Sequence, residues 1–347
     1  MIKLGVICPS EIAFRRFMPA LQYVEGIEFV GLGVCSLKER FGAIANINDV
    51  TQQEVIAGEY EKAKQFITTY GGKIFESYES IATSDEIDAL YVPLPPALHF
   101  KWAKLALESG KHVLVEKPST IHANDTKTLV EIAKKNNLAL HENYMFIFHN
   151  QLNAIEDIIK SGKIGDVRLY RVSFGFPRRA QNDFRYNKSL GGGALIDAGG
   201  YTIKYATRLL GPSIEIKYAQ MNYLSTDEVD IYGSAALVNN MGTTIQIAYG
   251  MDNNYKCELE VWGSKGCLNT GRILTAPAGF IPKVTIRSGN DEEIRDLPSD
   301  DTFKKSIEHF INCINNVSIR EETFNSIIKQ AELVDNFKEL ASNNKDN

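Results

Sequence analysis

The chain begins with short apolar segments that alternate with longer segments in which apolar residues recur every three or four positions. The apolar segments, which we predict to be buried strands, cover residues 2–8, 29–35, 87–92, 112–115 and 138–141. The amphipathic segments between them predict helices over residues 11–23, 59–70, 98–109 and 125–135. Strand–helix alternation of this kind is typical of a parallel sheet with right-handed crossovers.

The pattern changes near residue 142, where strand-like segments follow one another with few helices between them. They cover residues 167–176, 214–224, 229–239, 243–252 and 257–262. In one of them Ile245, Ile247 and Tyr249 alternate with smaller or polar residues, which is typical of a half-buried antiparallel strand. Two helices, over residues 302–315 and 323–340, end the chain. The pattern therefore predicts an α/β domain followed by an antiparallel sheet with flanking helices.

One connection, residues 36–58, is unusually long. It separates the second strand from the next helix, whereas such loops commonly have about 4–6 residues. A short helix over residues 51–57 fits its pattern. We expect a surface insertion, because loops lengthen at small entropic cost, and a functional lid is the alternative.

Composition excludes several classes of protein. The 347 residues include 38 Lys and Arg and 43 Asp and Glu, a formal net charge of −5, and no long basic run, so a nucleic-acid partner is not expected. No segment approaches the roughly 18 apolar residues of a membrane helix, and the N-terminal apolar run is too short for a signal peptide. The five cysteines form no CxxC pair, which favours a reducing, cytoplasmic setting.

The turn between the first strand and the first helix lies where α/β proteins bind the pyrophosphate of a dinucleotide. The glycines of such turns are missing from residues 8–13, so the turn is a weak signal by itself. Ser10 still offers a hydroxyl to a phosphate, and Glu11 and Ile12 lead into the helix. Ala13 is small enough for the helix to pack closely on the strand.

The end of the second strand bears on the ribose of the cofactor. NAD sites usually carry an acid there that accepts from the 2′-hydroxyl. Here Ser36, Lys38 and Arg40 follow the strand, and the first acid, Glu39, lies beyond the expected position. A hydroxyl and two cations suit a 2′-phosphate, so we predict NADP(H) in preference to NAD(H). An exposed charged turn is the structural alternative.

Two motifs carry a resemblance to a known family. The first is Glu116-Lys117-Pro118, at the end of the predicted strand over residues 112–115, and the second is the glycine-rich segment over residues 191–201, GGGALIDAGGY. The segments PLPPALH at residues 93–99 and ENYM at residues 142–145 occur in the matching order. With these four landmarks the chain resembles the Gfo/Idh/MocA oxidoreductase family over nearly its whole length.

The resemblance implies a fold and a set of site residues. It implies a Rossmann NAD(P)-binding domain over residues 1–142. An α+β domain for substrate binding and oligomerisation, with a large open, mainly antiparallel sheet, would span residues 143–347. The cofactor would lie near Pro93, Leu94, His99, Glu116 and Lys117. The substrate would be flanked by Lys117, Asp197 and Tyr201.

Hydride transfer to or from a sugar carbon requires proton transfer at the attached oxygen. A lysine ammonium or a phenol within about 3 Å of that oxygen supplies the proton and stabilises developing negative charge. A free phenol ionises only near pH ~10, so Tyr201, where many relatives have histidine, fits ketone reduction better than alcohol oxidation. Asp197 would orient the substrate or Lys117. The structural alternatives are a surface lysine before a proline that could form a cis bond, a core tyrosine and a helix-capping aspartate.

Other segments resemble a narrower group, the nucleotide-sugar 3-ketoreductases. They are SEIAFRR at residues 10–16, ENYMF at residues 142–146, and the basic stretch over residues 177–186. Arg178, Arg179 and Arg185 would meet a substrate diphosphate, with Phe176 or Tyr186 against its base or sugar. A loop of solvated cations is an equal alternative.

These observations lead to one hypothesis with two alternatives. We hypothesise an NADP(H)-dependent oxidoreductase that reduces a keto group on a nucleotide-linked sugar. A free aldose, polyol or diol dehydrogenase is the second hypothesis, and a cofactor-binding sensor without turnover is the third. His99, His141 and His149 lack a metal-binding spacing, so no metal is expected. An exposed sheet face is usually covered by a partner subunit, so we expect a homo-oligomer, a dimer or a tetramer.

Overall fold

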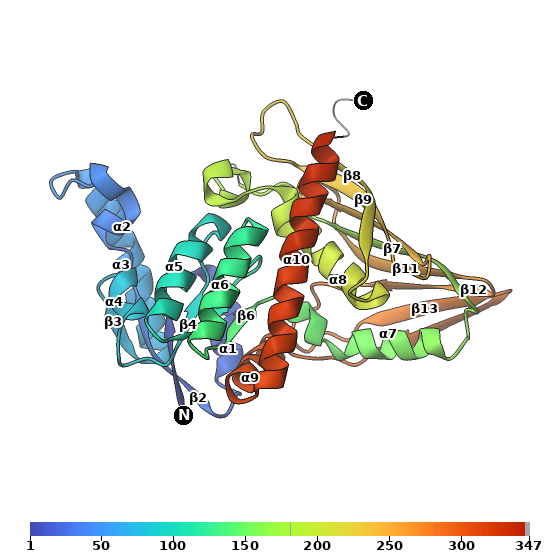
Figure 1. Cartoon of the computed structure of the whole chain (residues 1–347), viewed down its shortest axis with the longest axis horizontal. Coiled ribbons are helices and arrows are strands. Elements are labelled where there is room, and N and C mark those ends of the chain that lie inside the picture. The colour runs from blue at the N-terminus through green and yellow to red at the C-terminus, as the bar shows by residue number, and fades with distance from the viewer. Residues whose placement is uncertain (181, 344–347) are drawn as a thin grey trace. The chain divides into compact units, whose positions relative to one another are not determined.

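The chain forms two compact units, shown in a computed structural model that describes residues 1–180 and 182–343 (Figure 1). The first unit comprises Met1–Thr120, Asn124–Asn143 and Phe303–Ile327. The second comprises Ile121–Ala123, Tyr144–Thr302 and the chain from Ile328 onward. The expected domains, residues 1–142 and 143–347, differ from these two units mainly in one segment. The expected division leaves Phe303–Ile327 in the second domain, whereas these residues return to the first unit and pack there.

The first unit is built on a six-stranded parallel sheet with the order β3-β2-β1-β4-β5-β6. Its strands are β1 (Ile2–Val6), β2 (Ile27–Gly33), β3 (Lys73–Phe75), β4 (Ala89–Val92), β5 (His112–Val115) and β6 (Leu140–Glu142). The predicted parallel sheet is confirmed, and only the three-residue β3 is absent from the prediction. The strand order reverses at β1, between β2 and β4, and open α/β sheets bind their ligands at the carboxyl ends of the strands beside such a point.

Helices connect these strands, as the strand–helix alternation predicts. They are α1 (Met18–Leu21), α2 (Leu37–Phe41), α3 (Val50–Tyr70), α4 (Tyr78–Ala82), α5 (Pro96–Glu108) and α6 (Ala123–Lys135), and near the end of the chain come α9 (Thr302–Asn315) and α10 (Val317–Asn343). Gly110 follows α5 with a φ of 78°, a left-handed conformation that favours glycine and ends the helix.

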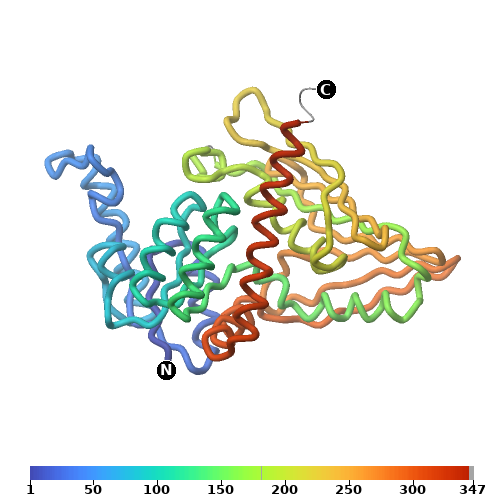
Figure 2. The backbone as a smooth tube through the Cα atoms, in the orientation of Figure 1, coloured from blue at the N-terminus to red at the C-terminus, as the bar shows by residue number. Residues whose placement is uncertain are grey.

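The long connection over residues 36–58 is largely helical and mostly exposed, and the short helix expected over residues 51–57 is part of a longer one. The helix α2 starts directly after β2, and α3 starts at Val50 and runs through the predicted short helix without a break. Gly58 does not interrupt α3, because a single glycine costs a long helix only about 1 kcal/mol. Together α2 and the start of α3 form an arm that extends from the rest of the first unit (Figure 2). The arm exposes three large apolar side chains, Ile44, Ile47 and Val50.

The second unit contains an eight-stranded sheet with the order β14-β13-β12-β11-β7-β10-β9-β8. Its strands are β7 (Val167–Gly175), β8 (Glu215–Asn222), β9 (Tyr232–Val238), β10 (Thr244–Gly250), β11 (Lys256–Gly263), β12 (Gly266–Gly271), β13 (Lys283–Ser288) and β14 (Asp291–Asp296). Every neighbouring pair is antiparallel except β7 with β10, which is parallel. The predicted mainly antiparallel sheet is confirmed, although β10 is antiparallel to only one of its neighbours.

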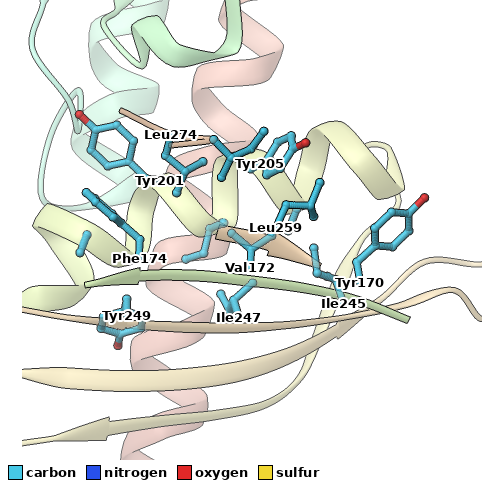
Figure 3. Packing of buried hydrophobic residues seen from close by; sticks show 14 of the residues in the cluster. Tyr170, Val172, Phe174, Tyr201, Tyr205, Ile245, Ile247, Tyr249, Leu259 and Leu274 are labelled. Carbon is cyan, nitrogen blue, oxygen red and sulfur yellow. The ribbon is translucent and has the colours of Figure 1, made fainter. Parts of the chain in front are cut away.

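One face of this sheet packs against α7 (Asn150–Lys160), α8 (Gly200–Leu210) and the C-terminal half of α10. The side chains of β7, β10 and β11 that face these helices form aligned rows (Figure 3). The rows are Tyr249–Phe174–Cys257, Ile247–Val172–Leu259 and Ile245–Tyr170–Val261. Because every second residue of a strand points to one face, the predicted alternation in β10 is the outcome of burial against α8.

The opposite face of the sheet carries polar and exposed aromatic side chains. Arg171 binds Gln246 and Glu260 across three adjacent strands. By strand register the same face also presents exposed apolar residues from β8, β9, β11 and β14. They are Tyr218, Tyr232, Trp262 and Ile294. Among the described residues, no helix is both long and apolar enough to cross a membrane.

Candidate active site

Candidate site residues occur in both units, and each half is described by itself. In the first unit, the turn after β1 leads into a helix that includes a π-helical turn over Ala13–Phe17. Ser10 Oγ accepts a hydrogen bond from the Ala13 N–H at 3.2 Å, so Ser10 caps this helix and keeps its hydroxyl proton for another acceptor. Ala13 is fully buried, as its small size predicts. Glu11 is exposed and pairs with Arg15 at 2.9 Å, while Ile12 is partly exposed at the helix start.

Ser36 begins α2 directly after β2. Ser36 Oγ accepts from the Glu39 N–H at 3.3 Å, and Glu39 Oε2 accepts from the Ser36 N–H at 2.8 Å. The Glu39 carboxylate also accepts from the backbone N–H groups of Tyr78 and Glu79. Glu39 therefore joins α2 to the start of α4 and is not the strand-end acid of an NAD site. Lys38 and Arg40, on the same short helix, are exposed.

A carboxylate that the sequence did not single out, Glu59 of α3, reaches the end of β2. Its Oε1 atom accepts from the Cys35 N–H at 2.6 Å and from the Tyr78 hydroxyl at 2.9 Å. Glu59 lies 24 residues after Cys35, so no local pattern could have indicated it. The contact anchors the base of the arm at the carboxyl end of β2.

Two cations act on Cys8, in the turn after β1. Burial, and after it the charge of Glu59, raise the pKa of the Cys8 thiol to about 12, while the positive charges of Arg40 and Lys62 oppose the rise. Both cations therefore act on the turn after β1. Arg40 was predicted as a cofactor contact, and Lys62 of α3 was not.

His99 of α5 connects the segments that follow β4 and β5. Its Nδ1 atom lies 2.7 Å from the Pro118 carbonyl oxygen, and its Nε2 atom lies 2.7 Å from the Leu94 carbonyl oxygen. The ring is fully buried, and burial lowers the pKa of His99 to about 4, with the charge of Lys117 acting in the same direction. His99 thus holds two predicted cofactor segments together, including the one that starts at Pro93.

The segment after β5 carries Glu116, Lys117 and a cis peptide bond between Lys117 and Pro118. Glu116 Oε1 accepts hydrogen bonds from the Tyr91 hydroxyl at 2.7 Å and from Asn143 Nδ2 at 2.6 Å. Burial raises the pKa of Glu116, while these two donors and the charge of Lys117 lower it. The donors therefore favour a carboxylate beside Lys117 despite the low polarity around it.

In the second unit, Tyr201 lies in the first turn of α8 among other aromatic rings. Its ring centroid lies 5.2 Å from that of Tyr144, 5.4 Å from Phe174 and 5.5 Å from Phe146. Its exposed fraction is only 8%, and its hydroxyl points away from the sheet (Figure 3). The packing fixes the orientation of the ring.

Asp197 lies in a π-helical turn, Leu195–Gly199, that precedes α8. It does not cap α8, so that structural alternative was wrong. Asp197 Oδ2 accepts from Arg185 Nε at 2.6 Å, and Arg185 also binds Asp183 at 3.1 Å. The ion pair with Asp197 is mostly buried, so it fixes the two predicted substrate residues against each other.

The arginines of the basic stretch have different partners. Arg178 pairs with Asp227 and, at 3.4 Å, with Asp252, and its guanidinium lies over the Tyr186 ring. Arg179 lies over the Phe176 ring at 5.0 Å, and its backbone N–H donates to the Tyr186 hydroxyl. In the described part of the chain Arg179 is the arginine of this stretch that no carboxylate neutralises.

The glycines before Tyr201 serve close packing within the second unit. A Cβ atom on Gly193, whose φ is +125°, would lie 2.5 Å from Asp230 Oδ1, and one on Gly200 would lie 2.2 Å from the Tyr144 hydroxyl. Asp230, which the sequence did not single out, accepts from the Leu195 N–H at 2.8 Å and holds the start of this helical segment. Burial raises the pKa of Asp230 to about 6. The protein itself therefore fills the space beside Gly193 and Gly200.

The described residues contain no group of three or more His, Cys, Asp or Glu side chains placed to hold a metal ion. The chemistry available is therefore that of hydrogen-bond donors, ammonium and guanidinium groups and phenols. In the first unit these groups lie at the strand ends that suit a dinucleotide, and in the second Tyr201 lies among the rings of Tyr144, Phe146 and Phe174.

Comparison with known proteins agrees with this geometry. Residues 26–144 match the family described as "Oxidoreductase family, NAD-binding Rossmann fold", and residues 152–269 match the "GFO/IDH/MocA C-terminal domain". A dTDP-3,4-didehydro-2,6-dideoxy-alpha-D-glucose 3-reductase from Actinomadura kijaniata is 35% identical over 335 residues, which is 96% of this chain and 94% of that protein. A protein of the same name from Streptomyces violaceoruber is 33% identical over 98% of this chain and 95% of its own length.

Solved structures show the same similarity. A 3-ketoreductase from Actinomadura kijaniata, in complex with NADP and TDP-benzene, superposes with a TM-score of 0.87 and 34% identity over 97% of each chain. An aldose-aldose oxidoreductase from Caulobacter crescentus shares the fold with a TM-score of 0.82 at 21% identity, over 99% of this chain and 98% of its own.

Proposed function

The chain belongs to the Gfo/Idh/MocA family of NAD(P)-dependent oxidoreductases, and we propose that it reduces the 3-keto group of a dTDP-linked deoxysugar with NADPH. The proposal depends on the presence of both Lys117, beside Glu116, and Tyr201, packed among aromatic rings. The chain is also 30–35% identical to four proteins named as the same dTDP-sugar 3-reductase. A sensor that only binds the cofactor has no use for two proton donors. The sensor alternative therefore has no support.

The donor set of the first unit fits NADP better than NAD. Ser10 offers a hydroxyl beside the helix that follows β1, and the arm offers Lys38, Arg40 and Lys62 near the ends of β1 and β2. Glu39 is engaged with backbone N–H groups, and the Glu59 carboxylate is engaged with Cys35 and Tyr78. We propose that Arg40 and Lys62 bind the 2′-phosphate. Bound NADPH supplies the hydride, and the protein supplies orientation and the proton.

The proposed proton donors act on the oxygen of the keto group. The Tyr201 ring is held by Tyr144, Phe146 and Phe174, and its phenol would donate a proton to the substrate oxygen. Lys117 follows Glu116 in the chain, and its ammonium group would stabilise negative charge as the alkoxide develops. Asp197 acts through its ion pair with Arg185, which positions the loop before Tyr201.

We propose that Arg179 and Phe176 bind the nucleotide part of the substrate. The Arg179 guanidinium offers a charge-assisted contact to the diphosphate. We also propose that Arg178 and Arg185 contact the substrate diphosphate. Both already pair with aspartates, which partly neutralise their positive charge.

Turnover of defined substrates tests the proposed function. The purified protein would be assayed with NADPH and either a dTDP-linked 3-keto-2,6-dideoxysugar or a UDP-linked keto sugar. Separate reactions would contain NADP⁺ and either D-xylose or a free vicinal diol. NADPH oxidation only with a nucleotide-linked sugar supports the proposal. Oxidation of the free sugar or the diol with no activity on nucleotide sugars would instead support the dehydrogenase alternative.

We also propose that the protein is a cytoplasmic homo-oligomer that pairs through the open face of the second unit's sheet. Exposed Tyr218, Tyr232 and Trp262 on that face provide apolar surface for a second copy. All five cysteines are unpaired, which suits a reducing compartment. Light scattering of wild type and Trp262→Glu tests the interface, because a charge at its centre would shift the protein toward monomer.

A further inference from the structure

A line of hydrogen bonds runs from α9 to the carboxylate beside Lys117. Ser306 Oγ donates to Asn143 Oδ1 at 2.7 Å, and Asn143 Nδ2 donates to Glu116 Oε1 at 2.6 Å. Ser306 and Asn143 are each 1% exposed. All three residues lie in the first unit, although Ser306 follows Asn143 by 163 residues.

The direction of each bond in this line is determined by chemistry. The Ser306 hydroxyl has one proton, which it gives to Asn143, so it accepts from His141 Nε2 at 2.8 Å. An Asn side chain has one acceptor end and one donor end. Because the Glu116 carboxylate can only accept, it takes the Nδ2 end of Asn143, and the Oδ1 end accepts the proton of Ser306.

The orientation of Asn143 matters because the opposite orientation would be unfavourable. A flipped amide would place Oδ1 against Glu116 Oε1, two acceptors without a proton between them. Glu116 would then lose one of its two side-chain donors and keep only the Tyr91 hydroxyl, at 2.7 Å. A buried carboxylate with fewer donors ionises less readily.

We propose that Ser306 is a positioning residue for the reaction, which acts through Asn143 to keep Glu116 an oriented carboxylate beside Lys117. The inference rests on the proposed function, because it assumes that Lys117 serves the substrate oxygen. Ser306 does not touch the substrate or the cofactor in this role. Its effect is to hold the side-chain amide of Asn143 in one orientation, and through that amide the Glu116 carboxylate.

The groups that surround this carboxylate come from several elements. Tyr91 projects from β4, and the charge of Cys8, in the turn after β1, is among the causes that raise its pKa. Asn143 follows β6, and Lys117 is the residue after Glu116 in the sequence. The charge of Lys117 also acts on His99 of α5, whose pKa it lowers. Among these groups, Glu116 is the one whose ionisation we expect a change at Ser306 to alter, since Asn143 binds it directly.

The test compares Ser306→Ala with two other variants. Ser306→Thr keeps a hydroxyl at the same place. Thr323→Val is the matched control, because it also removes a buried hydroxyl near α9, one that binds His309 and Cys313 and is separate from Glu116. Thermal unfolding would establish that all three variants are folded.

Steady-state kinetics give the first readout. We expect Ser306→Ala to lower kcat roughly three- to tenfold, with little change in KM for NADPH or the sugar. The acid limb of its kcat–pH profile should move to higher pH. Thr323→Val should match wild type, and Ser306→Thr should recover most of kcat. In Glu116→Gln, the added Ser306→Ala change should cost nothing more, because the two residues act in one line.

A second readout does not depend on turnover. Infrared difference spectra recorded across a pH titration, with Glu116→Gln to identify the band, report protonation of the Glu116 carboxyl. Ser306→Ala should move this protonation to higher pH. Unchanged kcat, pH profile and infrared titration in Ser306→Ala would overturn the inference, as would an equal loss in Thr323→Val. If wild type turns over no substrate, the proposed function fails, and the infrared titration still decides the role of Ser306.

Discussion

Asn143 and Tyr144 are joined by one peptide bond, yet each supports a different candidate catalytic residue. Asn143 donates to the Glu116 carboxylate that neighbours Lys117, and Tyr144 packs edge-on against the ring of Tyr201. The junction between the two compact units falls between these two residues. The segment ENYM resembles a family motif, and these contacts suggest a physical reason for it. Its consecutive residues Asn143 and Tyr144 support one candidate catalytic residue in each unit.

If Lys117 and Tyr201 supply the proton, single substitutions at either residue should greatly lower the rate of reduction. Lys117→Ala and Tyr201→Phe should each lower kcat about 10²- to 10⁴-fold, the usual contribution of a positioned acid or base. Tyr201→Phe should leave NADPH affinity unchanged, since Tyr201 lies in the second unit. Tyr205→Phe is the control, because Tyr205 is a buried tyrosine one turn further along α8 whose hydroxyl has no hydrogen-bond partner in the described structure. A Tyr201→Phe enzyme with wild-type kcat would remove the phenol from the mechanism.

Cofactor choice should depend on the cations of the arm. Lys62→Ala and Arg40→Ala should each weaken NADPH binding about 10- to 150-fold through loss of one charge-assisted contact, which contributes about 1.5–3 kcal/mol. NADH, which lacks the 2′-phosphate, should bind as before. The matched control is Lys64→Ala, because Lys64 lies on the same helix and pairs with Glu61 in solvent. Fluorescence titration with both cofactors measures the selectivity, and equal losses for NADPH and NADH would contradict the assignment.

The buried imidazole of His99 predicts acid sensitivity. Its pKa is about 4 in the folded protein and near 6.5 in the unfolded chain, so the unfolded state takes up a proton first as pH falls. Stability from this group is therefore complete above pH 6.5 and is lost as pH falls toward 4, by about 3 kcal/mol in total. Urea unfolding of wild type and His99→Gln at several pH values tests this. The variant should be less stable at pH 7 and should show a flatter dependence on pH, whereas parallel curves would refute the prediction.

Close packing at Gly200 predicts that a single methyl group will disturb the site. Gly200→Ala would place Cβ 2.2 Å from the Tyr144 hydroxyl, and Tyr144 contacts Tyr201. We expect a loss of stability of about 1–3 kcal/mol from overpacking, together with a fall in kcat. Gly58→Ala is the control, because Gly58 lies in α3 with open space around it, and alanine there should raise the melting temperature slightly. A Gly200→Ala protein with wild-type melting temperature and kcat would show that Tyr144 can move aside.

The sequence determined the features that depend on neighbouring residues. Apolar runs and helical periods predicted the parallel sheet, the mainly antiparallel sheet and most of their strands, because the period of burial is written locally. The motif around Lys117 and the segment that ends at Tyr201 were recognisable for the same reason. The three-residue β3 was not predicted, because so short a strand leaves no periodic pattern, and α2 was not predicted although Ser36 and Glu39 form a local capping pattern at its start.

The tertiary structure decided which of these residues have partners and what those partners do. Ser306 meets Asn143 across 163 residues, Asp230 meets Leu195 across 35, and Glu59 meets Cys35 across 24. The pairing of Asp197 with Arg185 and the use of Glu39 by α4 likewise arise only when separate elements pack together. Side-chain partners of this kind are selected by three-dimensional packing and by the need to satisfy buried polar groups, and neither leaves a periodic trace in the sequence.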